Sequence, residues 1–130
     1  MRRLLLFLIL GSLPLSAQTA TQNNFSSNVQ GITIGTYHCY FWFHVVAGWD
    51  FEAACYGPGN AITLIDVDKQ AATHQKSYNI CFSGEISPTP CTTKPAYISW
   101  LIIPSGSQLI YSLAGRGPDD TSDLIVNGTI

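Results

Sequence analysis

Histidine, aromatic and acidic residues recur at every second position along two adjoining segments in the first half of the chain. The candidate ligand-binding residues are Tyr40, Trp42 and His44 in the first segment and Asp50, Glu52 and Tyr56 in the second. A spacing of two places side chains on one face of a β-strand. Rings beside carboxylates suit a sugar, whose C–H faces stack on the rings and whose hydroxyls donate to the acids. The alternative is that a second sheet covers this face, and its aromatics are core.

A single hairpin puts these six residues on the same face. With a three-residue loop at 46–48, the facing pairs are Val45 and Trp49, Phe43 and Phe51, Phe41 and Ala53, and Cys39 and Cys55. All eight side chains of those pairs lie on the face opposite the candidate residues. Because a slip of one residue would break both the apolar face and the cysteine pair, we predict this register.

Catalytic chemistry has little support in the sequence. His44 opposite Asp50 would provide the orienting half of a Ser-His-Asp triad. However, the chain has no G-x-S-x-G elbow for a nucleophile, and no pair of carboxylates stands out as acid and base. We therefore predict that the protein is not an enzyme, and keep a small secreted hydrolase using His44 and Asp50 as an alternative.

The sequence also predicts no metal and no cofactor. His38 and His44 are six residues apart on one strand, which at about 3.3 Å per residue is too far to share an ion. The acidic group Asp119, Asp120 and Asp123 lacks the EF-hand pattern of calcium sites. The cysteines lack the close C-x-x-C pairs of structural zinc sites.

The first seventeen residues have the pattern of a secretory signal peptide. Arg2 and Arg3 precede an apolar run at 4–10, and small residues lead to Ala17. The run is shorter than the roughly 20 residues that a membrane-spanning helix needs. We predict cleavage before Gln18, secretion or display at the cell surface (extracellular or periplasmic), and no membrane insertion afterwards.

Charge and cysteine content limit the partners and the compartment. Beyond residue 17, four basic side chains remain against eight acidic ones, so nucleic acid is excluded as a partner and anionic lipid is a poor one. An even number of cysteines in an exported chain indicates disulfides. The hairpin register pairs Cys39 with Cys55, which leaves Cys81 for Cys91.

The rest of the chain is divided by turn-forming residues. Residues 18–30 are polar and are predicted to be a flexible leader that could add a strand to a neighbouring copy and drive self-assembly. Further strands are expected at 32–36, 61–67, 77–82, 96–103, 108–113 and 123–130, with short helical turns at 68–74, a surface loop at 83–93 and a flexible link at 115–120. In the second hairpin, around 104–107, Trp100 is expected to face Tyr111.

About seven strands separated by turns predict an all-β fold for 31–130, a single antiparallel β-sandwich of immunoglobulin-like or jelly-roll layout. A sandwich without a catalytic motif is typical of a noncatalytic extracellular interaction or structural module, whose partner is an unknown protein or glycan. The first alternative is a carbohydrate-binding module using Tyr40, Trp42 and Tyr56.

Overall fold

A computed structural model describes residues 18–26, 28–44, 50–57, 62–69, 73–81, 85–91 and 95–130. The predicted signal peptide, the loop at 46–48 and the pair of Val45 and Trp49 lie outside these residues. The described part of the chain contains no helix, so it has none that is long and apolar enough to cross a membrane.

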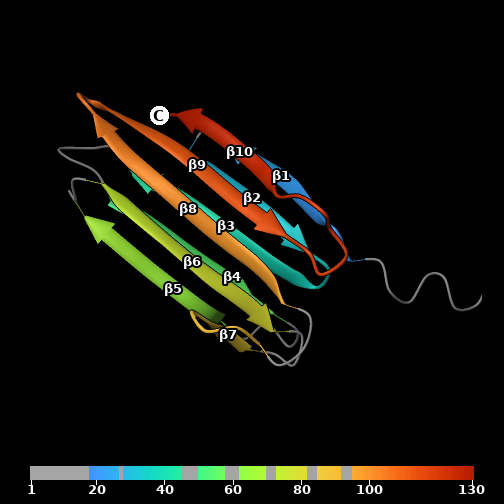
Figure 1. The fold of residues 1–130 in the computed structure, drawn as a ribbon. Coiled ribbons are helices and arrows are strands. Elements are labelled where there is room, and N and C mark those ends of the chain that lie inside the picture. Colours follow the sequence, from blue (N-terminus) through green and yellow to red (C-terminus); the bar gives the residue numbers. More distant parts are fainter. Residues whose placement is uncertain are drawn as a thin grey trace, which may run out of the picture.

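Within these residues, ten strands form two antiparallel sheets that pack face to face (Figure 1). The first sheet contains β1 (Ala20–Ser26), β2 (Val29–Ile34), β3 (Tyr37–His44), β4 (Asp50–Tyr56) and β5 (Ile62–Lys69), in that order. The second contains β6 (His74–Cys81), β7 (Glu85–Ser87), β8 (Ala96–Ser105), β9 (Gln108–Arg116) and β10 (Leu124–Thr129), in the order β10-β9-β8-β6-β7. The predicted β-sandwich is therefore confirmed.

The order of the strands refines the expected layout. Consecutive strands are neighbours almost throughout, and the chain passes between the sheets once, from β5 to β6. Immunoglobulin-like and jelly-roll sandwiches instead interleave strands from both sheets. Here Gly35 and Gly106 have positive φ, of 57° and 63°, in two-residue loops. Such loops match the twist of a hairpin and keep adjoining strands in one sheet. Strands β1 to β5 therefore form a meander, as do β8 to β10, whereas β8 pairs with β6 rather than with β7.

The core lies between the sheets and is rich in aromatic rings. Phe41 and Phe51 of the first sheet contact Trp100 of the second, with ring centroids 5.8 and 5.5 Å apart. Phe43 packs on Tyr111 at 4.6 Å. Each large side chain buried in this way contributes about 1.5–3 kcal/mol. Aliphatic side chains complete the core, among them Ile32, Ile34, Ile80, Ile98, Ile102, Leu109 and Leu113.

The register of the first hairpin is as predicted over its described residues. Cys39 faces Cys55, Phe41 faces Ala53 and Phe43 faces Phe51. Both predicted disulfides are present, Cys39–Cys55 with Cα atoms 4.1 Å apart and Cys81–Cys91 with Cα atoms 5.5 Å apart. Two disulfides indicate an oxidising compartment.

The predicted pairing in the second hairpin is wrong by two residues. Trp100 faces Leu113 rather than Tyr111, because the loop is the two residues at 106–107 rather than four. Strand β8 continues through Pro104, which faces Leu109. The backbone N–H and C=O of Leu109 both bond to Ile130 instead. Proline has no N–H to donate, so its presence here costs the β8–β9 pairing no hydrogen bond. A shift of two residues preserves the face of every side chain, and the predicted core face is therefore correct.

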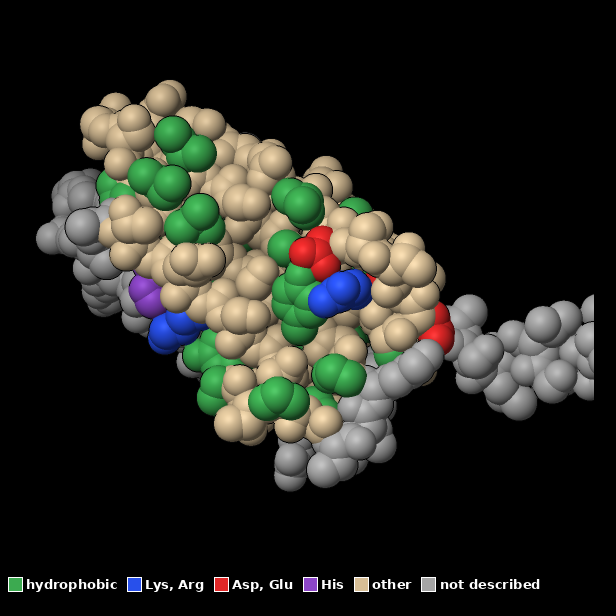
Figure 2. All heavy atoms as spheres, viewed as in Figure 1, with side chains coloured by type: hydrophobic (Ala, Val, Ile, Leu, Met, Phe, Trp, Pro, Cys, Tyr) green, Lys and Arg blue, Asp and Glu red, His purple; other side chains and the backbone are tan. Residues whose placement is uncertain are grey.

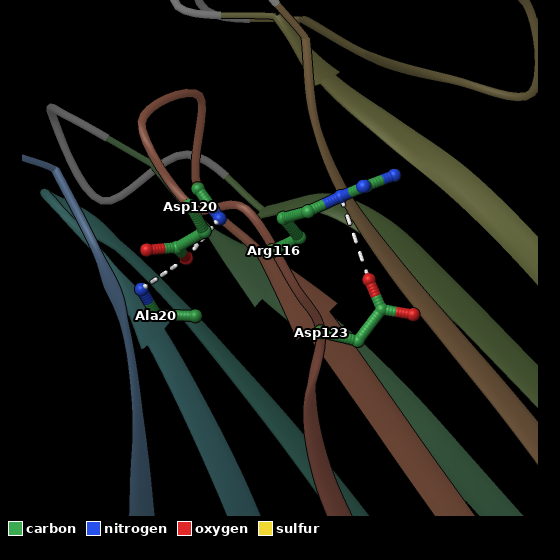
Figure 3. Close-up of polar contacts among 5 residues, drawn as sticks. Ala20, Arg116, Asp120 and Asp123 are labelled. Atoms are coloured by element: carbon green, nitrogen blue, oxygen red, sulfur yellow. Dashed lines mark hydrogen bonds and ion pairs between the residues drawn. The ribbon is translucent and has the colours of Figure 1, made fainter.

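The predicted flexible leader is also corrected. Residues 20–26 form β1, an edge strand paired with β2, and β2 itself begins at Val29. Figure 1 shows β1 in blue beside β10 in red, and the two strands are in contact. The Asp120 carboxylate accepts the backbone N–H of Ala20 at 3.0 Å and of Gly117 at 2.7 Å. Figure 3 shows this carboxylate reaching from the turn after β9 to the start of β1.

Three shorter segments also differ from the prediction, because each contains residues that belong to a strand. Asp68 and Lys69 end β5 rather than capping a helix, and residues 70–72 lie outside the described chain. Residues 85–87, within the predicted surface loop, pair with β6. The stretch predicted as a flexible link starts as part of β9 and ends at the bonded Asp120.

Candidate ligand-binding face

Four aromatic side chains lie on the outer face of the first sheet, away from the second sheet. Along β3, Phe41 and Phe43 are buried in the core, whereas Tyr40 and Trp42 alternate with them and are only partly buried. Tyr56 of β4 and Phe25 of β1 lie on the same outer face as Tyr40. We call these four residues, Phe25, Tyr40, Trp42 and Tyr56, the aromatic face. The second sheet packs against the opposite side of β3, so it does not cover these rings.

Tyr40 is the centre of the aromatic face. Its ring centroid lies 5.3 Å from that of Phe25, 5.7 Å from that of Trp42 and 5.7 Å from that of Tyr56. Trp42 is nearly parallel to Tyr40, at 28°, and Tyr56 meets it edge-on at 71°. Such contacts stabilise aromatic pairs beyond the area that they bury. The rings therefore form one compact cluster rather than a long row.

Phe25 is the member of this cluster that the sequence analysis missed, because it lies in the predicted leader. Phe25 is 57% exposed. A Cβ at Gly31 would lie 2.8 Å from Phe25 Cε2, and Gly31 faces Tyr40 in the β2–β3 pairing. The Phe25 ring therefore crosses the bare backbone of β2 to reach Tyr40. Its only signal in the sequence is that it is the one aromatic residue among residues 18–30.

An open depression of about 350 Å³ lies within this face, lined by His38, Tyr40, Trp42 and Tyr56. A row of polar side chains crosses β1, β2 and β3 beside it. The Asn23 amide Nδ2 donates a short hydrogen bond to Thr33 Oγ1, which lies 3.2 Å from His38 Nδ1. The sequence suggests His38 only as a possible metal ligand, whereas the structure places it at the depression.

The acidic end of the face is arranged differently from the prediction. His44 faces Asp50 and Trp42 faces Glu52, as expected from the register. The ion pair, however, joins His44 Nε2 to Glu52 Oε2 at 3.8 Å, because the longer Glu side chain reaches its diagonal neighbour. Its members are 55% and 45% exposed, so the pair contributes little to stability. Asp50 Oδ1 is buried and accepts no hydrogen bond from the described residues.

Among the described residues, His44 has neither a serine nor a cysteine partner, and no metal cluster is found. Within the described chain, His44 contacts Glu52 and makes no hydrogen bond to a serine, and all four cysteines are in disulfides. The described ranges contain no group of three histidine, cysteine or acidic side chains able to hold a metal ion.

The outer face of the second sheet, seen in Figure 2, has few charges among its scattered hydrophobic side chains. Arg116 lies over the Tyr97 ring, 4.9 Å from its centroid, and its Nε is 3.4 Å from Asp123 Oδ1 (Figure 3). Burial, together with a hydrogen bond to Asp123, raises the pKa of Tyr97 to about 12. These polar groups therefore bond one another.

Comparisons with protein-family models, with curated proteins and with solved structures give no match. What this protein does is therefore inferred from the geometry of the aromatic face.

Proposed function

We propose that the protein is an exported, noncatalytic binding module and that the aromatic face is its recognition surface. The observation that carries this proposal is that Tyr40, Trp42 and Tyr56 lie outside the sandwich rather than in its core. Tyrosine and tryptophan are enriched where proteins bind partners. A cluster of large rings that is not needed for the core is typical of such a site.

Export is supported by two independent features. The first seventeen residues have the pattern of a signal peptide, and the two disulfides suit an oxidising compartment. The partner is then an extracellular or periplasmic protein or glycan. The acidic balance of residues 18–130 disfavours nucleic acid.

A small hydrolase using His44 and Asp50 is the competing proposal. Against it, the contact of His44 is the exposed Glu52, and a triad needs a buried carboxylate that orients the histidine toward a nucleophile. Self-assembly through the N-terminal segment is a further competitor. Against it, β1 already pairs with β2 of its own chain.

The test uses the intact, disulfide-bonded protein on two arrays, one of neutral and anionic oligosaccharides and one of displayed peptides. We expect the wild type to bind members of at least one array. The double variant Tyr40→Ser/Trp42→Ser should lose more than tenfold in affinity, because both substitutions remove rings without touching the core. Ile110→Ser, an exposed position on the opposite outer face, is the matched control and should bind normally.

Two results would reject the proposal. One is a wild type that binds neither array, and the other is a double variant that binds as well as the control. Mass spectrometry of the bound probes separates binding from catalysis. Intact probes support the module, whereas cleavage that disappears in His44→Ala would make the protein a hydrolase.

A further inference from the structure

We propose that the depression in the aromatic face binds a single neutral sugar residue, with His38 Nε2 donating a hydrogen bond to a sugar hydroxyl. This inference rests on the proposed function and adds to it the class of ligand and the residue that determines specificity. It is built from the hydrogen-bond row beside the depression, from the unused polar atoms around it, and from its size and charge.

The hydrogen-bond row gives Nδ1 of His38 a partner, and the proposal assigns the ring proton to Nε2. Thr33 Oγ1 accepts from the Asn23 amide, and its hydroxyl has a single proton to give. In the proposed arrangement the Thr33 hydroxyl gives that proton to His38 Nδ1, 3.2 Å away, rather than accepting a second hydrogen bond from it. In the neutral imidazole one nitrogen accepts and the other donates, so Nε2 bears the hydrogen. Asn23 and Thr33 thus act as positioning residues for a donor at the depression.

The other polar atoms around the depression have no hydrogen-bond partner within the described chain. Within the described chain, the hydroxyls of Tyr40 and Tyr56 and the indole N–H of Trp42 make no hydrogen bond, and neither does His38 Nε2. The depression therefore combines ring surfaces with four polar atoms free to bond. A sugar residue has the matching chemistry, because it presents apolar C–H groups on its faces and hydroxyls around its rim.

Size and charge favour a neutral sugar over a protein or an anion. All three outer rings lie within 5.3 to 5.7 Å of the Tyr40 ring, and the depression holds about 350 Å³. Small-ligand pockets are typically about 300–1,000 Å³, whereas a stable protein partner buries about 800 Å² on each side. Among the described residues, no lysine or arginine lines the depression, and the acidic residue that faces Trp42 is Glu52. These described residues therefore offer an anionic ligand no permanently charged partner.

The test titrates the intact protein with methyl glycosides of neutral hexoses and N-acetylhexosamines and with the matching uronic acids. Binding is followed by calorimetry and by ligand-observed NMR. We expect saturable binding of at least one neutral glycoside, with weaker binding of the uronic acids. Trp42→Ala should weaken it at least tenfold and His38→Leu at least fivefold. His38→Gln, which keeps an N–H donor, should recover part of that loss, and Ile125→Ser on the far face should change nothing.

A second measurement tests the role of His38 without any ligand. Nitrogen NMR of the imidazole should show the Nε2–H form in the wild type and a mixture of both forms in Thr33→Val, which lacks the hydroxyl. Finding the Nδ1–H form in the wild type would overturn the assigned donor. Thermal unfolding of each variant confirms that the fold is retained.

The outcomes separate the two proposals. If the protein binds peptides through the aromatic face and binds no glycoside, the proposal of a sugar ligand is wrong. The proposal that the protein is a binding module would still hold. Tighter binding of the uronic acids than of the neutral glycosides would show that the ligand is not a neutral sugar. Glycoside binding that His38→Leu leaves unchanged would overturn the donor role. A wild type that binds neither glycosides nor peptides would reject both proposals.

Discussion

The carboxylate of Asp120 links the start of β1 to the turn after β9. One oxygen, Oδ2, accepts both the Ala20 N–H and the Gly117 N–H. Asp120→Ala leaves two partly buried donors unpaired, and at about 1 kcal/mol each we expect a loss of about 2 kcal/mol in the free energy of unfolding. Asp120→Asn can keep both bonds with its amide oxygen. It loses only the charge, which roughly doubles the strength of a hydrogen bond, so we expect about half that loss.

Urea unfolding followed by far-ultraviolet circular dichroism measures these differences. With a slope of about 1–3 kcal/mol per molar urea for a small domain, the midpoint of Asp120→Ala should fall by roughly 1 M. Thr121→Ala is the matched control, because Thr121 is exposed in the same turn. Hydrogen exchange should show that amides of β1 lose protection before those of β8, since β1 is an edge strand.

Two results would refute this reasoning. If Asp120→Ala unfolds at the same urea concentration as Thr121→Ala, the carboxylate does not stabilise the fold. If Asp120→Asn is as damaging as Asp120→Ala, the charge rather than the pair of accepted hydrogen bonds is what matters. Ligand affinity is a second measurement of whether β1 stays attached, because β1 carries Phe25 of the aromatic face. Detachment of β1 should weaken ligand binding even though Asp120 lies outside the depression.

Two further predictions concern covalent and ionisable groups. Replacing Cys39 and Cys55 together by alanine opens a link across 16 residues and should lower the free energy of unfolding by about 3 kcal/mol, measured by urea unfolding; a loss below about 1 kcal/mol would contradict this. The pKa of Tyr97 is raised to about 12, above the unfolded value near 10. Its stabilising contribution is therefore complete below about pH 10 and is lost as the pH rises toward 12. Tyr97→Phe should remove a phenolate step near pH 12 from an absorbance titration, and an unchanged titration curve would contradict this expectation.

The first hairpin shows how much local sequence determines. Alternation of side chains and the length of the loop are sufficient to place Cys39 opposite Cys55 and Phe43 opposite Phe51, because a shift of one residue would reverse every side chain. The second disulfide then follows by elimination. In the second hairpin the same reasoning found the correct face but the wrong partners, since a shift of two residues leaves alternation unchanged.

The position of the first strand was decided by tertiary structure. Residues 18–30 have the composition of a loose segment, yet residues 20–26 are held by pairing with β2 and by Asp120, 100 residues away in the chain. Contacts over that separation leave no local pattern to read. The same strand brings Phe25 to Tyr40, so the candidate site was incomplete in the sequence analysis.

Alternation alone determined that two faces exist on β3 and β4 and which residues share each of them. It did not determine which environment each face meets, because both faces carry large aromatic rings, and a ring stabilises a core or a binding surface equally well. The tertiary structure decided this by packing Trp100 and Tyr111 of the second sheet against Phe41, Phe51 and Phe43. That choice leaves Tyr40 and Trp42 on the outside, since a strand has only two sides and the core occupies one.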